Sequence, residues 1–232
     1  MIRVASYNIR KAIGTDRRRR PERTIDVLNE LGADIIALQE ADRRFGSRAS
    51  AIPVQLLEEH SDYRPVDFDT RAGSIGWHGN ALLVRKSVEV LERHLFHLPS
   101  LEPRGAVLAD VKLDGSVLRV VGMHMFLSGL WRRRQAHAIL THLGERDGDP
   151  STVLMGDLNE WSVRGGCLRD FGKHHHFAPC GRSFHARRPI AMLDRIMVTH
   201  DLDIVDSGAH ASVTSRRASD HLPIWAELRR AD

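Results

Sequence analysis

The stretch Val-Leu-Met-Gly-Asp-Leu-Asn-Glu-Trp, residues 153–161, indicates both the fold class and the place of the chemistry. The apolar run at residues 152–155 is typical of a buried strand, and it ends at Gly156. Asp157 and Asn159 follow. In α/β proteins, reacting groups lie where strands end, because the backbone turns there out of the core. On extended backbone the i, i+2 spacing would place both side chains on one side.

The chemistry of these two side chains suits hydrolysis of a phosphate ester. The carboxylate of Asp157 can take a proton from water, and the amide of Asn159 can hold a phosphoryl oxygen. Gly, Asp and Asn are equally ordinary where a strand enters a turn. The stretch alone therefore leaves a simple turn as the alternative.

The bulk composition is that of a globular protein. The chain has 232 residues, 42% of them hydrophobic, and a net charge of +4. A positive charge suits an anionic partner, but the excess of Arg over Lys can equally reflect genome composition, so the charge alone decides nothing. No apolar run is long enough to cross a bilayer, and Met1 leads directly into an apparent strand. We therefore expect a cytoplasmic protein without an integral membrane segment. Cys167 and Cys180 lack metal-type spacing and are predicted to be free thiols.

Hydrophobic periodicity predicts many strands and few helices. The predicted strands are residues 3–9, 34–39, 80–85, 88–98, 105–113, 118–125, 152–155, 190–198, 202–209 and 222–228. The predicted helices are residues 21–31, closed by Gly32, residues 52–60 and residues 131–144. Residues 164–188 are expected to be irregular and mobile. Because no repeat or linker interrupts the chain, we expect one α/β domain spanning residues 1–232, with mostly antiparallel pairing.

A set of polar residues lies at or beside the ends of the predicted strands. They are Asn8, Glu40, Asn80, His124, Asp157, Asn159, Asp194, Asp220 and His221. Singly, most have an ordinary explanation: Glu40 could pair with Arg43 or Arg44, and Asp194 with Arg195, while His124 is typical of a core histidine. Buried carboxylates are costly unless they are paired or bound to metal. So many polar groups at strand ends therefore indicate a functional site.

Short motifs along the chain strengthen this interpretation. They are Ser-Tyr-Asn-Ile-Arg (6–10), Leu-Gln-Glu-Ala-Asp (38–42), Gly-Asn-Ala-Leu-Leu (79–83), Gly-Met-His (122–124), Gly-Asp-Leu-Asn (156–159), Leu-Asp-Arg-Ile (193–196) and Ser-Asp-His-Leu-Pro-Ile (219–224). In this order they resemble the endonuclease/exonuclease/phosphatase superfamily, which includes deoxyribonuclease, abasic-site endonucleases, neutral sphingomyelinases, inositol-polyphosphate phosphatases and deadenylases. The resemblance implies a four-layer αββα sandwich with two packed mixed, largely antiparallel β-sheets.

The resemblance also implies a divalent metal at one rim and assigns its ligands. Glu40 would be the principal Mg²⁺ ligand, with Asn8 and Asp220 nearby, and Mn²⁺ is the expected substitute. Asp157 would orient and deprotonate the attacking water, held by Asn159.

The remaining roles implied by the resemblance concern the phosphate. His221, oriented by Asp194, would donate to a non-bridging oxygen. His124 would contact the phosphate or assist the leaving oxygen, and Asn80 would hold the phosphate or the neighbouring side chains. No covalent enzyme intermediate is expected.

Departures from the family pattern narrow the function. Abasic-site endonucleases usually carry a tyrosine where this chain has His124. Inositol-polyphosphate 5-phosphatases carry Cys-Asp-Arg where this chain has Leu-Asp-Arg, beginning at Leu193. We expect a Mg²⁺-dependent phosphodiesterase acting on a phosphate ester, with a small phosphodiester or phospholipid headgroup slightly favoured over nucleic acid. The alternatives are a nuclease acting on DNA or RNA, and a catalytically silent binding module on the same fold. A lost catalytic carboxylate would favour the silent module, and none is lost.

Three further features bear on specificity. Arginines at 104, 132–134, 187–188 and 216–217 could form a basic collar for a polyanion or an ordinary solvated surface. Trp161 could stack on a base, lie in an interface or pack against the sheet edge. His174, His175 and His176 are candidates for an adventitious transition metal.

Overall fold

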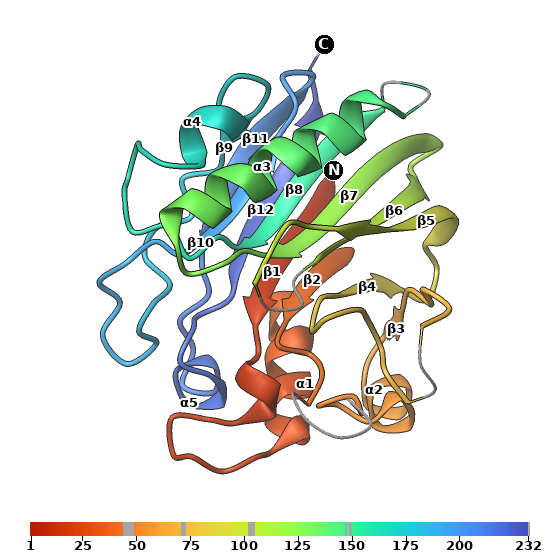
Figure 1. Cartoon of the computed structure of the whole chain (residues 1–232). Coiled ribbons are helices and arrows are strands. Elements are labelled where there is room, and N and C mark those ends of the chain that lie inside the picture. The colour runs from red at the N-terminus through yellow and green to blue at the C-terminus, as the bar shows by residue number, and fades with distance from the viewer. Residues whose placement is uncertain (44–48, 71–72, 102–104, 147, 149, 232) are drawn as a thin grey trace.

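The strands of this computed structural model, which describes residues 1–43, 49–70, 73–101, 105–146, 148 and 150–231, fall into two groups. The first group is β1 (Ile2–Asn8), β2 (Ile35–Gln39), β3 (Tyr63–Pro65), β4 (Ala81–Arg85), β11 (Leu202–Ala209) and β12 (Ile224–Arg230). The second is β5 (Glu89–His97), β6 (Gly105–Leu113), β7 (Ser116–His124), β8 (Ser151–Asp157), β9 (His176–Phe177) and β10 (Asp194–Val198). Among the described residues each group forms a six-stranded sheet (Figure 1).

Both sheets are mixed and largely antiparallel. The first has the order β11-β12-β1-β2-β4-β3, and the second has the order β5-β6-β7-β8-β10-β9. β1 runs parallel to β2 and antiparallel to β12, while β7 runs parallel to β8 and β8 antiparallel to β10. The fold class expected from the sequence is confirmed.

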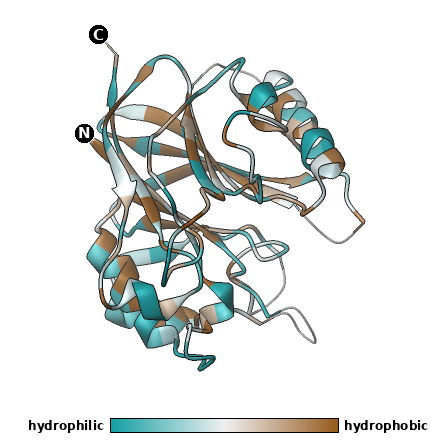
Figure 2. Ribbon diagram, turned by 90° about the vertical axis from the view of Figure 1, so that its left-hand side faces the viewer, coloured by the Kyte–Doolittle hydropathy of each residue, from teal (hydrophilic) through white to brown (hydrophobic). Residues whose placement is uncertain are grey.

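Helices cover the outer faces of the two sheets. α1 (Pro21–Leu31) and α2 (Val54–His60) lie against the first sheet, and α3 (Gly129–Gly144) lies against the second (Figure 1). Figure 2 shows these helices on opposite outer sides, each with hydrophobic and hydrophilic stretches. The short helix α4 (Leu168–Phe171) contacts α3, and the short helix α5 (Ser215–Ala218) contacts α1. Three buried hydrophobic clusters fill the spaces between the four layers.

α1 illustrates how the sequence determines an element. Pro21 occupies its first turn, where a missing N–H costs nothing. Ile25, Leu28 and Leu31 recur at helical spacing and are buried against the first sheet. The helix ends at Gly32, whose φ of 59° lies in the left-handed region that glycine adopts without strain. The predicted helix is confirmed.

The segment before β10 differs from the prediction. The expected strand at residues 190–198 begins only at Asp194, because the backbone N–H groups of Ile190 and Ala191 donate to the carbonyl of Phe184. The region expected to be irregular, residues 164–188, contains α4 and β9. These elements of four and two residues are too short for periodicity to show.

Both cysteines are buried free thiols, as predicted. Burial raises the pKa of Cys167 to about 11 and that of Cys180 to about 12. The thiolate forms are therefore scarce at neutral pH. Within the described part of the chain, no helix combines the length and apolar character needed to cross a membrane.

Candidate active site

The alternation of side chains along the strands brings the predicted site together. Val4 packs in the core between the sheets, and the period of two places Asn8, further along β1, on the same inner face. In the second sheet, His124 is the register partner of Asp157, and Asp157 is the partner of Asp194. The ends of β1, β7 and β8 and the start of β10 therefore meet at one edge of the sandwich.

One oxygen of Asp157 is the centre of this arrangement. Its Oδ2 accepts a hydrogen bond from Asn8 Nδ2 at 2.9 Å. The Nε2 atoms of His124 and His221 lie 3.5 Å and 3.7 Å from the same oxygen. The Asp157 carboxylate is buried, so these polar neighbours offset the loss of its hydration.

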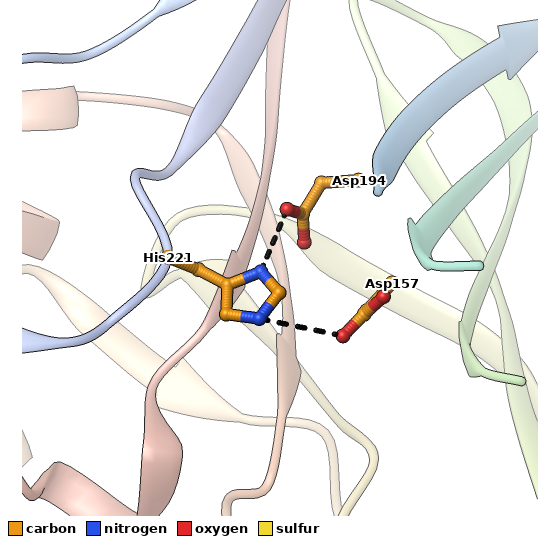
Figure 3. A group of neighbouring side chains, drawn as sticks. All are labelled: Asp157, Asp194 and His221. Carbon is orange, nitrogen blue, oxygen red and sulfur yellow. Dashed lines mark hydrogen bonds and ion pairs between the residues drawn. The ribbon is translucent and has the colours of Figure 1, made fainter. Parts of the chain in front are cut away.

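A second carboxylate orients His221. The ring lies between Asp194 and Asp157, with Nδ1 turned to Asp194 and Nε2 to Asp157 (Figure 3). His221 Nδ1 is 2.8 Å from Asp194 Oδ2, and the Ser183 hydroxyl donates to the same oxygen. Burial alone would lower the pKa of His221, but attraction to Asp194 and then to Asp157 outweighs it and raises the pKa to about 10. The expected pairing of Asp194 with the Arg195 guanidinium is absent from the described contacts, because Arg195 donates to the Asp194 carbonyl instead.

Asn159 does not lie beside Asp157 in the expected way. Its φ is 50°, so the backbone at Asn159 is not extended, and the extended geometry assumed for the i, i+2 spacing does not hold there. The Asn159 backbone N–H donates to Asp157 Oδ1 at 2.9 Å, and its side chain donates to the carbonyl of Met125 at 3.0 Å. The residue therefore holds Asp157 through its backbone.

Asn80 is completely buried at the start of β4. Its amide donates to the carbonyl of Gly105 at 2.9 Å and more weakly to that of Trp77. Within the described chain, its Oδ1 has no hydrogen-bond partner. Because the donor side of the amide is already used, the geometry favours the second of the two expected roles, holding neighbouring segments.

Two cations contact the expected metal ligands, and sequence reasoning missed both. The Lys11 ammonium contacts Glu40, and Arg10 Nε lies 3.2 Å from Asp220 Oδ2. The backbone N–H of Arg10 also donates to Asn8 Oδ1 at 3.1 Å. Arg43 makes no described ion pair with Glu40, and Arg44 lies outside the described residues. The basic pair Arg10-Lys11, which begins two residues after Asn8, was the available signal.

The donor set fits a hard divalent cation. Glu40, Asn8 and Asp220 offer two carboxylates and an amide, the oxygen ligands that Mg²⁺ prefers. Ser219 connects two of these residues, because its hydroxyl lies 2.7 Å from the Asn8 carbonyl and 3.4 Å from Asp220 Oδ1. A second group of side chains could also hold a metal ion, because ligand atoms of Asp157, Asp194 and His221 lie within 4.8 Å of one another.

An aromatic pair borders the site. The Phe184 ring centre is 4.9 Å from that of His221, and Trp161 meets Phe184 edge to face at 6.1 Å. Trp161 is 62% exposed, which excludes the expectation that it packs against the sheet edge. Phe184 was missed from the sequence, because its neighbours Arg182 and Ser183 carry no hydrophobic pattern.

The expected basic collar is smaller than the sequence implied. Arg132 is buried and its guanidinium lies 3.1 Å from Glu160. Arg187 and Arg216 donate to the backbone carbonyls of Thr15 and Ala186, and Arg104 lies outside the described residues. Arg132 therefore does not belong to a collar.

The histidine run forms no metal cluster among the described residues. His174 and His175 meet at 6.5 Å between ring centres, and His176 stacks on His200 at 5.6 Å. His175 itself is buried, and its ring lies 3.3 Å from the carbonyl of Phe171.

Comparisons with known proteins identify the family and agree with the fold. The uncharacterized protein YbhP of Escherichia coli K12 is 27% identical over 251 residues, which cover 97% of this chain and 95% of that protein. The mannosyl-6-phosphatase Bt3783 of Bacteroides thetaiotaomicron is 19% identical with a TM-score of 0.77, covering 99% of this chain and all (100%) of that one. TDP2 of D. rerio, complexed with a single strand DNA product, is 17% identical with a TM-score of 0.74 and 98% coverage of both chains. The sequence profile of the Endonuclease/Exonuclease/phosphatase family matches residues 5–221. The chain belongs to the endonuclease/exonuclease/phosphatase family.

Proposed function

We propose that this protein is a Mg²⁺-dependent phosphodiesterase that works by in-line attack of a water molecule. The observation that carries the proposal is the approach of Asn8, His124 and His221 to one buried oxygen of Asp157. A carboxylate at a strand end can accept the proton of a water molecule, and two imidazoles beside it can stabilise charge on a phosphoryl group. Family membership supports hydrolysis of a phosphate ester.

His221 is suited to act as the charged donor. Its raised pKa, about 10, keeps the imidazole protonated at neutral pH. Asp194 holds Nδ1, so Nε2 is directed toward Asp157, where the phosphate would lie. His124 offers a further contact with the phosphate or the leaving oxygen. Asp194 is in this proposal a positioning residue.

Glu40, Asn8 and Asp220 would hold the Mg²⁺. When bound, the metal supplies polarisation of a phosphoryl oxygen and offsets charge on the leaving group. Asn159 and Asn80 complete the site by fixing Asp157 and the loop before β4.

The substrate we propose is a small phosphodiester or a phospholipid headgroup. Relatives in fold include both an enzyme named for a sugar phosphate and TDP2 with its single strand DNA product, so the fold does not choose between these classes. The arginines favour the smaller substrate, because Arg132 is committed to Glu160 and Arg187 and Arg216 donate to backbone carbonyls.

A nuclease is the second candidate. Trp161 is 62% exposed and reaches the site through Phe184. Such an indole can stack on an unpaired base. The salt dependence of oligonucleotide binding, predicted in the Discussion, separates the two candidates.

The test is hydrolysis of bis(4-nitrophenyl) phosphate, with 4-nitrophenyl phosphate as the monoester, in Mg²⁺, in Mn²⁺ and in EDTA. We expect diester hydrolysis in both metals and none in EDTA. Asp157→Ala is expected to lower turnover by at least about a hundredfold, as for loss of a general base. Glu40→Ala is expected to weaken Mg²⁺ binding measured by calorimetry, whereas Glu58→Ala, an exposed carboxylate on α2, is the matched control.

Full activity in EDTA or in Asp157→Ala would contradict the assigned mechanism. Monoester hydrolysis without diester hydrolysis would make the protein a phosphomonoesterase. A folded protein that binds Mg²⁺ but hydrolyses neither ester would support the silent binding module.

A further inference from the structure

A pocket of about 660 Å³ lies beside β10 of the second sheet. Its lining comes from α4, β9 and β10 and from the loops that follow β8 and β9. Its apolar lining comes chiefly from Val163, Leu168, Phe177 and Met192. A volume of this size is typical of sites for small organic ligands.

The pocket is distinct from the candidate active site. Alternation along β10 directs Asp194 and Ile196 to the inner face and Arg195 and Met197 to the outer face. Arg195 and Asp194 both line the pocket, whereas Asp157, the centre of the active site, does not. The two sites therefore adjoin at Asp194, and the other residues that line the pocket do not belong to the active site.

Arg195 gives the pocket its chemistry. The residue is only 7% exposed, and its guanidinium donates one described hydrogen bond, from Nη1 to the Asp194 carbonyl at 3.1 Å. Among the described residues Arg195 forms no ion pair: of the two acids nearby, Asp194 is paired with His221 and Glu160 with Arg132. A buried guanidinium without a counter-ion is costly, and it retains N–H groups that match a carboxylate or phosphate.

The mouth of the pocket carries a second cation. Arg164 lines it and is exposed, as is Val163 at 66% exposure. Positive charge at both the wall and the rim, joined by apolar side chains, favours a ligand with an anionic head and an apolar body.

We propose that this pocket binds an amphiphilic anion, with its carboxylate or phosphate on the Arg195 guanidinium and its apolar body against Leu168, Phe177 and Met192. The site is separate from the catalytic one, so occupancy does not require the proposed phosphodiesterase activity. Arg195 donates to the carbonyl of Asp194, and the carboxylate of Asp194 orients His221. A ligand on Arg195 would therefore bind at the residue next to Asp194.

The test is calorimetric titration of the whole protein with decanoate and with decyl phosphate, each below its micellar concentration. We expect saturable binding of at least one of them with one site per chain. Decanol and decyltrimethylammonium, which lack the negative charge, are expected to bind at least about tenfold more weakly, because a charged hydrogen-bonded pair is lost. Arg195→Met is expected to reduce the anion's affinity by a similar factor.

A second variant guards against misfolding of Arg195→Met. Val163→Glu places a carboxylate at the exposed mouth and should weaken binding by repulsion, while Val213→Glu, at an 81% exposed position outside the pocket lining, should not. Preference for decyl phosphate over decanoate would identify the head group as a phosphate, and the reverse as a carboxylate. Absence of saturable binding by both anions, or equal binding by Val163→Glu and the unmodified protein, would overturn the proposal.

Discussion

The two oxygens of Asp157 have different surroundings. Oδ1 accepts the Asn159 backbone N–H, and Oδ2 accepts Asn8, with two imidazoles at 3.5 Å and 3.7 Å. Those longer separations exceed a good hydrogen bond. The carboxylate is thus fixed in direction by short bonds on both oxygens while its histidine neighbours stand further off. We expect this arrangement if Asp157 acts as a base, because a water molecule could then lie between its carboxylate and the two histidines.

Replacing the carboxylate beside His221 tests their coupling. His221 is charged below its pKa, so an activity that needs the imidazolium is present below the pKa and lost as pH rises through it. Asp194→Asn removes the main attraction that raises the pKa, so we expect the alkaline limb of the pH–rate profile to move to lower pH. Ser183→Ala, which keeps the carboxylate, is the control and should move the limb less. An identical limb in Asp194→Asn would refute the coupling.

His175 makes stability depend on pH in acid. Burial, and then the nearby His174, His200 and His176, lower the pKa of His175 to about 4 despite the Phe171 carbonyl. The unfolded chain protonates at about 6.5, so stability falls as pH drops from there toward about 4. At about pH 5, this effect lowers the free energy of unfolding by up to about 2 kcal/mol. We expect His175→Gln to abolish this loss, which urea unfolding measures. His174→Gln removes only one of the smaller causes of the shift and should retain most of the loss, so equal slopes in both variants would disprove the assignment.

Some residue-level features were readable from the sequence and others were not. Asn8, Asp157 and Asp194 sit on inner faces because strand alternation places them there, which periodicity predicts. The left-handed turn at Asn159 and the contact of Lys11 with Glu40 depend on local backbone and on residues distant in the chain. No pattern of residue types encodes those contacts.

At the scale of elements, the parallel pair β7 and β8 carries His124 and Asp157 in register. Gly156 sits one residue before Asp157, opposite Met123. A Cβ atom at Gly156 would lie 1.8 Å from the Met123 carbonyl oxygen, which is backbone and cannot rotate away. Glycine at this position therefore allows the two strands to approach closely enough to bring the side chains of His124 and Asp157, two residues of the proposed site, together.

Gly156→Ala is accordingly expected to force these strands apart. We expect a loss of about 3 kcal/mol or more in the free energy of unfolding, together with a fall in hydrolysis, because the neighbouring catalytic pair would move. Denaturant unfolding and the diester assay measure the two effects. Gly144→Ala, at the end of α3 with no atom within 4 Å of the added Cβ, should be neutral or slightly stabilising. Unchanged stability in Gly156→Ala would show that the strands can shift at little cost.

Most element bounds were predictable because the strands are long and alternate. β6 and β11 match the expected residues 105–113 and 202–209 completely. The predicted start of β10 was wrong, because Ile190 continues the apolar pattern but its backbone N–H donates to the carbonyl of Phe184. The packing of two sheets face to face followed from the family resemblance and not from periodicity, which does not order strands within a sheet.

At the scale of the molecule, the charge distribution bears on the substrate. Single-stranded binding that neutralises several phosphates gives a slope of about −0.7 in log affinity against log salt for each contact. With Arg132 buried against Glu160, we predict a slope near −1, equivalent to about one or two phosphates. The measurement is titration of Asp157→Asn protein with oligonucleotides across a salt series at fixed Mg²⁺. A slope of about −4 or steeper would make the nuclease the better assignment.

The position of β1 between β12 and β2 governs when the site forms during protein synthesis. β1 emerges early from the ribosome, but its antiparallel neighbour begins at Ile224, and Ser219 reaches the Asn8 carbonyl across 211 positions of the chain. Until residues 219–230 have been translated, one edge of β1 lacks its partner, and Asp220 and His221 are missing from the site. Such long-range pairing folds slowly. The proposed site therefore assembles only after residues 219–230 have been translated, and a nascent chain arrested before Ser219 carries no assembled site.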